Sequence, residues 1–137
     1  MQPKTLLRLS SEFISMMSKM SDDDLIEGLV RASIEKSYYY AFLAIREAMT
    51  AIGIYITYTP KAHSEVIEKL KGLCEPKTAN ACGRKLRSLR YQRNKATYVL
   101  SAKIDKIDAE SSILEITELL DELSRDKSMG AEILNYQ

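Results

Sequence analysis

Residues that interrupt helices are rare along this chain, and this scarcity limits the folds open to it. There are only five glycines and three prolines among 137 residues, and proline in particular cannot continue the interior of a helix. Between these residues, apolar side chains recur at helical spacing. We therefore expect long amphipathic helices in one domain, because the chain is long enough for one core but not for two.

The sequence predicts neither a membrane segment nor a metal site. No apolar run is long enough to span a bilayer. The first ten residues, MQPKTLLRLS, lack the apolar block of a secretory signal peptide, so we expect a cytoplasmic protein. Cys74 and Cys82 belong to no CxxC pair or Cys/His cluster, which predicts packed thiols rather than metal ligands. We expect no cofactor.

The expected fold is an all-α antiparallel bundle of about five helices. It occupies residues 1–126, and residues 127–137 are expected to form a loosely held tail. Ser21 is placed to cap the second helix, and Gly53 is placed to end it. Residues 54–59 (IYITYT) are expected to form an extended loop, because no second strand is available to pair with them. The helices are expected at residues 5–20, 22–52, 60–72, 76–100 and 108–125.

The second expected helix carries two stripes along its length, one of bulky and one of small residues. Bulky side chains fill a core, whereas small ones let another helix backbone approach closely. We therefore predict that this helix lies at the centre of the bundle. The bulky stripe comprises Tyr38, Phe42, Ile45, Met49 and Ile52, and the small stripe comprises Ser37, Ala41, Ala44, Ala48 and Ala51.

The net charge of +1 conceals a strong segregation of charge. Residues 76–104 contain eight basic residues and no acidic one, whereas residues 105–126 contain eight acidic and two basic ones. A cationic helix of this kind suits nucleic-acid phosphates, an acidic protein partner or simply a solvated face. The candidate nucleic-acid-binding residues are Arg84, Arg87, Arg90, Tyr91 and Lys95, with Tyr91 available to stack on a base.

Arg93 stands on this basic helix where a hydrophobic residue is expected. A guanidinium in an apolar row must pair with a charge, meet a partner chain or serve a ligand, because a buried charge without a partner is costly. One interpretation pairs Arg93 with a carboxylate of the acidic last helix, and the other has it bind a phosphate. The row steps by four and three residues, as one helix face requires: Cys82, Leu86, Leu89, Arg93, Ala96 and Leu100.

Three short stretches resemble motifs of the HEPN domain family, a group of small helical bundles often found beside minimal nucleotidyltransferases. Residues 93–98 read Arg-Asn-Lys-Ala-Thr-Tyr, residues 37–42 read Ser-Tyr-Tyr-Tyr-Ala-Phe, and residues 60–64 read Pro-Lys-Ala-His-Ser. The family signature is an Arg, usually followed by a polar residue, with a His further along the same helix. One branch carries Arg-x-x-Ala-Asp-Tyr instead. The resemblance covers roughly residues 26–123 in order and spacing.

This resemblance implies a homodimer and, for members with the full motif, a metal-independent ribonuclease. The Arg would hold the scissile phosphate and the His would move the 2′-hydroxyl proton. Here Arg93 and Asn94 match the first two positions, and Tyr98 occupies the His position. A tyrosine with an ordinary pKa near 10 is a poor base at neutral pH. Arg93 and Tyr98 are about 140° apart around a straight helix, so we expect convergence across a dimer rather than within one chain.

His63 is the only histidine. We expect it in the first turn of a helix, where the helix dipole lowers its pKa. One interpretation is that His63 caps the helix or packs in the core. The other is that it supplies the missing base, which requires the fold to carry it to the cleft of Arg93.

Three functions fit the sequence. The first is a homodimeric module that binds RNA or nucleotide phosphate through Arg93, Asn94 and Tyr98 without cleaving it, paired with a nucleotidyltransferase. The second is a metal-independent ribonuclease, such as the toxin of a toxin–antitoxin pair. The third is a structural dimer without a ligand, in which a carboxylate across the interface holds Arg93. Tyr98 at the His position favours the first over the second.

Overall fold

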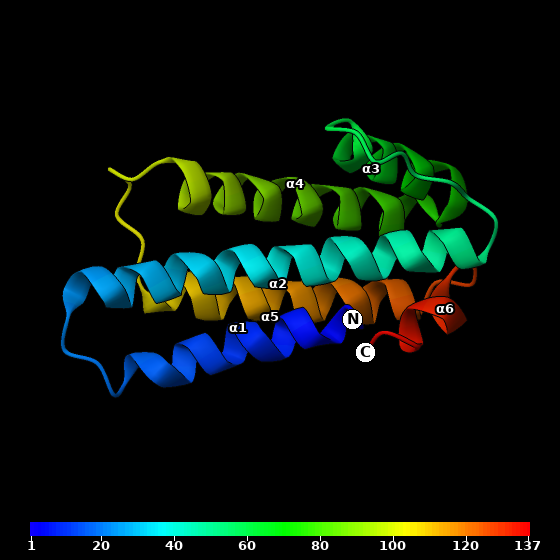
Figure 1. Cartoon of the computed structure of the whole chain (residues 1–137). Helices are drawn as coiled ribbons and strands as arrows, with labels where there is room; N and C mark the ends of the chain where they lie inside the picture. The colour runs from blue at the N-terminus through cyan, green and yellow to red at the C-terminus, as the bar shows by residue number, and fades with distance from the viewer.

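The computed structural model describes all of residues 1–137, which form six helices and no strand. This confirms the expected all-α bundle. In Figure 1, α1 and α4 run in one direction and α2 and α5 in the other, while α3 lies alongside α4 and α6 sits at one end. The helices are α1 (Lys4–Met17), α2 (Asp23–Ala51), α3 (Ala62–Leu73), α4 (Pro76–Tyr98), α5 (Lys106–Ser124) and α6 (Gly130–Leu134).

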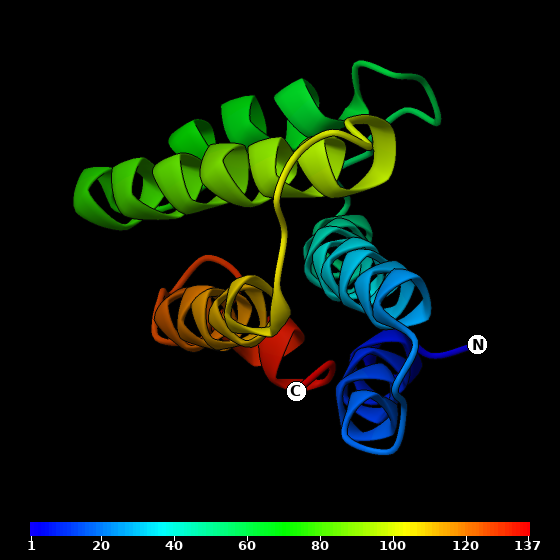
Figure 2. The ribbon, with the colours of Figure 1, turned by 90° about the vertical axis from the view of Figure 1, so that its left-hand side faces the viewer.

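The second helix, α2, is the centre of the bundle, as its two stripes predict. It contacts every other helix, and the end-on view in Figure 2 places it between α1 and the layer formed by α3 and α4. Four residues of the bulky stripe and four of the small stripe are buried. The pattern ends one turn early, because Ile52 is only partly buried and Ala51 is exposed.

The helix boundaries follow local capping chemistry. Asp22, not Ser21, caps α2, and its carboxylate accepts hydrogen bonds from the backbone N–H groups of Asp24 and Leu25 at 3.0 and 3.1 Å. Gly53 adopts a φ of 87° after α2, a left-handed conformation that glycine reaches without strain. Helix α4 ends at Tyr98, so Leu100 lies beyond the helix and is 81% exposed rather than part of the apolar row.

Residues 127–137 are not the loose tail that the sequence predicted. Met129 and Ile133 are 1% and 0% exposed and belong to the main core, and the carbonyl of Tyr136 accepts a hydrogen bond from the Tyr40 hydroxyl. The turn before α6 needs glycine, because a Cβ on Gly130 would lie 2.4 Å from the Ser124 carbonyl oxygen. The segment therefore closes one end of the bundle.

No helix combines sufficient length with sufficient apolar character to cross a bilayer. The charge segregation persists in three dimensions, because α4 and α5 pack side by side. Only one cation of α4 is paired with α5. Lys85 lies 3.5 Å from a carboxylate oxygen of Glu122 and 4.0 Å from one of Glu118. The remaining cations of α4 are therefore not neutralised by the neighbouring acidic helix.

Candidate functional site

Arg93 is buried against aromatic rings and not against a carboxylate. Its side chain is 6% exposed, and its guanidinium carbon lies 5.4 and 5.2 Å from the ring centroids of Tyr38 and Tyr39 on α2. It forms no salt bridge, so the expected pairing with a carboxylate of the last helix is absent from this chain. The rings compensate part of its buried charge through cation–π attraction.

The guanidinium of Arg93 makes no hydrogen bond to the protein. Its Nε is sealed from solvent without an acceptor, and the same holds for Nε of Arg90 one turn earlier. The terminal nitrogens of both arginines also lack acceptors in the protein, but they are not sealed from solvent. Buried donors are normally satisfied, so the two sealed Nε groups are exceptions, and the accessible terminal nitrogens are the donors left for an acceptor from outside the chain.

These donors face a cavity of about 770 Å³. Its walls come from α4, from the start of α3 and the loop before it, from Tyr39 of α2 and from the segment that follows α4. No acidic side chain lines it. The cavity unites most of the residues that the sequence singled out: Arg90, Tyr91, Arg93, Asn94, Lys95, Tyr98 and His63.

Arg93 and Tyr98 line the same cavity within one chain, although the sequence predicted convergence only across a dimer. The helix stays regular through both residues, so they do not converge by a helix break. Tyr98 is the last helical residue and 72% exposed, which leaves its ring at the rim while Arg93 lies at the base. A ligand wide enough to span this cavity therefore contacts both.

The other predicted basic residues divide between two places. A second hollow of about 480 Å³ adjoins the cavity and shares Arg90, Tyr91 and Asn94 with it, and Arg87 lines this second hollow. Arg84 is exposed one turn further away and lines neither. The structure thus gathers every predicted nucleic-acid-binding residue except Arg84 around two adjoining hollows.

His63 lies in the first turn of α3 and reaches this cavity, as its interpretation as a functional residue requires. Its Nδ1 lies 2.5 Å from the Tyr38 hydroxyl, and its ring packs 4.4 Å from the Phe42 ring. Burial lowers the pKa of His63 to about 4, and the charges of Arg90, Arg93 and Arg46 contribute to the decrease. The imidazole is therefore neutral at neutral pH.

Arg46 is a buried cation that the sequence analysis missed. It is 7% exposed on α2, its guanidinium carbon lies 3.6 Å from the Tyr58 ring centroid, and its Nη2 has no acceptor. Its place between two alanine positions of the small stripe gave no signal in the sequence, because an arginine at such a position usually points to solvent. The positive charge of Arg46 contributes to the lowered pKa of His63, which lines the cavity.

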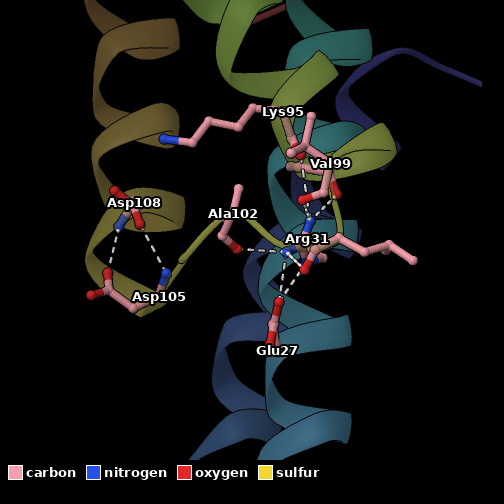
Figure 3. Close-up of polar contacts among 9 residues, drawn as sticks. Glu27, Arg31, Lys95, Val99, Ala102, Asp105 and Asp108 are labelled. Atoms are coloured by element: carbon pink, nitrogen blue, oxygen red, sulfur yellow. Dashed lines mark hydrogen bonds and ion pairs between the residues drawn. The ribbon is translucent and has the colours of Figure 1, made fainter.

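Arg31 is a second missed residue, and it fixes the wall of the cavity (Figure 3). Its Nη1 donates to the carbonyls of Ala96 and Val99 at 2.8 and 3.1 Å, and its Nη2 donates to that of Ala102 at 2.8 Å. These bonds satisfy carbonyls left open at the end of α4. The i,i+4 pair with Glu27, 2.6 Å long, was readable in the sequence, but the reach of Arg31 to α4 was not.

Glu35 of α2 is a carboxylate whose pKa is affected by the charge of Arg93. Burial raises the pKa of Glu35, but hydrogen bonds from Lys36 and Thr97 and the charges of Lys36 and Arg93 lower it overall. Glu35 accepts from the Thr97 hydroxyl at 3.0 Å and from Lys36 at 3.1 Å, so its oxygens are engaged outside the cavity. It does not line the cavity and leaves the donors of Arg93 free.

Metal chemistry has no ligand set in this structure, since no group of three or more His, Cys, Asp or Glu side chains is arranged to hold an ion. Both cysteines are buried and free.

No protein-family model, curated protein or solved structure matches this chain. The resemblance to HEPN domains therefore stays a prediction. The fold and the site together define a small helical bundle with a cationic, tyrosine-rimmed cavity.

Proposed function

We propose that this protein binds RNA, or the phosphate of a nucleotide, in the cavity that Arg93 lines. The observation that carries the proposal is a buried guanidinium without an acceptor beside a cavity without a carboxylate. Phosphate oxygens accept the paired hydrogen bonds that a guanidinium donates. Arg90 and Lys95 add positive charge to the same cavity, and the Asn94 amide adds further hydrogen-bonding capacity.

Two features favour RNA over an isolated phosphate. Tyr39, Tyr91 and Tyr98 line the cavity, and tyrosine rings are platforms on which bases stack irrespective of sequence. The second hollow continues from the first through Arg90, Tyr91 and Asn94, and it adds the charge of Arg87. Its one carboxylate, Glu68, is paired with Lys71 at 3.1 Å. Two adjoining hollows with a net positive charge suit a ligand with successive phosphates, which is a short single strand.

The proposal includes a homodimer, which the family resemblance implies. Tyr98 and Val99 line the cavity and are exposed, and the exposed Leu100 follows them in the chain; this apolar stretch supports a partner surface there. Leu100→Asp is expected to convert a dimer into a monomer in sedimentation equilibrium, because a carboxylate in that stretch is costly to bury. The proposed nucleotidyltransferase partner rests on the resemblance alone, and co-purification with proteins encoded by neighbouring genes tests it.

The test of RNA binding compares two arginines of the same helix. Arg93→Ala and Arg84→Ala remove the same charge from α4, but only Arg93 lines the cavity. With fluorescently labelled oligouridine, we expect Arg93→Ala to weaken binding about tenfold or more, because hydrogen bonds to charged groups contribute about 1.5–3 kcal/mol. Arg84→Ala should change affinity only slightly. Equal losses in both variants would mean diffuse attraction to the helix and would contradict a cavity site.

Stability and salt provide two further readouts for the same pair of variants. Arg93→Ala loses no salt bridge or hydrogen bond, only side-chain packing and the cation–π contacts with Tyr38 and Tyr39, so the protein should stay folded with a modestly lower thermal midpoint. Loss of folding would instead support the structural alternative. The affinity of the wild type should fall steeply with salt, with a logarithmic slope of roughly −0.7 per phosphate contacted on a single strand. A flat response to salt would refute phosphate binding.

A second candidate function is metal-independent RNA cleavage, and one observation favours it. His63 and Arg93, a candidate base and a phosphate-binding residue, line one cavity. Incubation of wild type, Arg93→Ala and His63→Ala with RNA in EDTA tests it. Fragments from the wild type alone would establish a nuclease whose centre includes both residues. Intact RNA in all three samples would leave binding without cleavage.

A further inference from the structure

The two ring nitrogens of His63 have different surroundings. Nδ1 is engaged with the Tyr38 hydroxyl at 2.5 Å. Nε2 makes no hydrogen bond to the protein, and it is not among the polar atoms sealed from solvent. Since His63 lines the cavity beside Arg90 and Arg93, Nε2 is the nitrogen left for whatever occupies the cavity.

The environment of Tyr38 decides which nitrogen of His63 carries the proton. Tyr38 is 2% exposed, and its hydroxyl has no hydrogen-bond partner in the protein other than Nδ1. Because a buried hydroxyl hydrogen requires an acceptor, the Tyr38 O–H donates and Nδ1 accepts. Burial also raises the pKa of Tyr38, so the phenol keeps this hydrogen. In a neutral imidazole whose Nδ1 accepts, the single ring proton resides on Nε2.

Burial, together with the charges around His63, keeps the ring neutral. Its pKa of about 4 reflects burial first and then the nearby cations, Arg90 and Arg93 from α4 and Arg46 from α2. A second proton would have to bind Nδ1 and displace the hydrogen bond from Tyr38. The ring therefore presents an N–H donor to the cavity, beside the unused donors of the two arginines of α4.

We propose that His63 is a further phosphate-binding residue, which donates from Nε2–H as a neutral imidazole, and that Tyr38 is the positioning residue that fixes this tautomer. The inference rests on the proposed function and deepens it by adding a neutral donor to the site. It also excludes the role of base that the second candidate function gives to His63. With Nδ1 occupied and Nε2 protonated, the ring has no free lone pair with which to act as a base on RNA.

A spectroscopic experiment tests the tautomer without any substitution. Because His63 is the only histidine, a long-range 1H–15N correlation spectrum of the labelled wild type contains one pair of ring nitrogens. At neutral pH we expect Nε2 to be protonated and Nδ1 to be unprotonated. Tyr38→Phe keeps the ring and removes the hydroxyl, so both tautomers should become populated. A proton on Nδ1 in the wild type, or an imidazolium, would overturn the proposal.

A binding experiment tests the contact with the ligand. Addition of oligouridine should shift the Nε2 signal, and His63→Phe, which keeps the ring packing against Phe42, should weaken affinity about tenfold, the effect of one hydrogen bond to a charged acceptor. The wild-type affinity should show no inflection near pH 6.5, because the neutral ring is the binding form. The diester phosphates of this probe do not titrate in that range.

The outcomes separate this inference from the proposed function. RNA binding that requires Arg93 but leaves the Nε2 signal and the affinity of His63→Phe unchanged would overturn the role of His63 and retain the cavity as an RNA site. An affinity that rises as pH falls through 6.5 would identify an imidazolium and overturn the neutral donor. Absence of RNA binding by the wild type would overturn both proposals together.

Discussion

Replacing Arg31 should destabilise the protein far more than replacing any exposed arginine. Arg31 donates to carbonyls in the last turn of α4 and in the segment beyond it, and its side chain is 11% exposed. The bonds to Val99 and Leu100 involve exposed carbonyls that water can hydrate once the side chain is gone, so they contribute little to stability. The ion pair with Glu27 also contributes little, because the Glu27 side chain is 42% exposed. The bonds to Ala96 and Ala102, both 2.8 Å long, determine the magnitude.

Each bond from a charged donor contributes about 1.5 kcal/mol at the lower end of its range, so Arg31→Ala should cost about 3 kcal/mol. For a chain of this length, that cost corresponds to a decrease of roughly 10 °C in the thermal midpoint. Urea unfolding followed by circular dichroism measures it, with Arg84→Ala as the matched control. Arg31→Lys should recover little, because an ammonium does not present the planar fork that spans separate carbonyls. A loss below about 0.5 kcal/mol for Arg31→Ala would refute the assignment, since surface substitutions change stability by that amount.

Three further predictions concern other parts of the molecule. Gly130→Ala should lower the thermal midpoint by several degrees, because its Cβ would meet the Ser124 carbonyl; an unchanged midpoint would mean that the turn before α6 relaxes freely. The free energy of unfolding should decrease as pH falls from 6.5 towards 4. In that range the unfolded chain binds a proton at His63, whereas the folded chain, in which the pKa of His63 is lowered, does not. Urea titrations at several pH values measure this slope, and His63→Phe should flatten it. Tyr98→His should raise RNA cleavage if a base is all that the site lacks, and an unchanged cleavage rate in EDTA would assign the limitation to geometry.

The helices could be predicted from the sequence because their signals are local. Apolar periodicity and rare breakers located the five long helices within a few residues, and the stripes of α2 identified the central helix. The segment after α5 was misassigned for the same reason. Its only fully buried apolar side chains are Met129 and Ile133, and α6 is too short to display a period, so the burial of that segment depends on the rest of the bundle.

The candidate site was predicted in part, and the division has a physical cause. Arg93 was conspicuous because it interrupts an apolar row, which is a local pattern. The partners of Arg93 depend on contacts between residues that are distant in sequence. The sequence suggested carboxylates of α5 as partners, whereas the structure has the rings of Tyr38 and Tyr39. Arg46 was missed because nothing nearby in sequence marks it as buried, although its charge contributes to the lowered pKa of His63.

Arg31 and Arg93 are both held between α2 and α4, and the contrast between them gives the strongest argument for a ligand. Arg31 is saturated with acceptors, so it fixes the end of α4 and the Val99 and Ala102 wall of the cavity. Arg93 has no acceptor in the protein: its Nε is sealed, but its terminal nitrogens stay open to a ligand. A ligand that supplies acceptors to these terminal nitrogens does not have to order the site, because Arg31 and the two tyrosine rings already hold it in place. Oligouridine at a hundred times its dissociation constant should thus stabilise the folded protein by about 2.7 kcal/mol in urea titrations. A tenfold weaker affinity in Arg93→Ala should reduce that increment to about 1.4 kcal/mol at the same RNA concentration. An equal increment in both proteins would mean that RNA binds elsewhere and that the unused donors of Arg93 have another explanation.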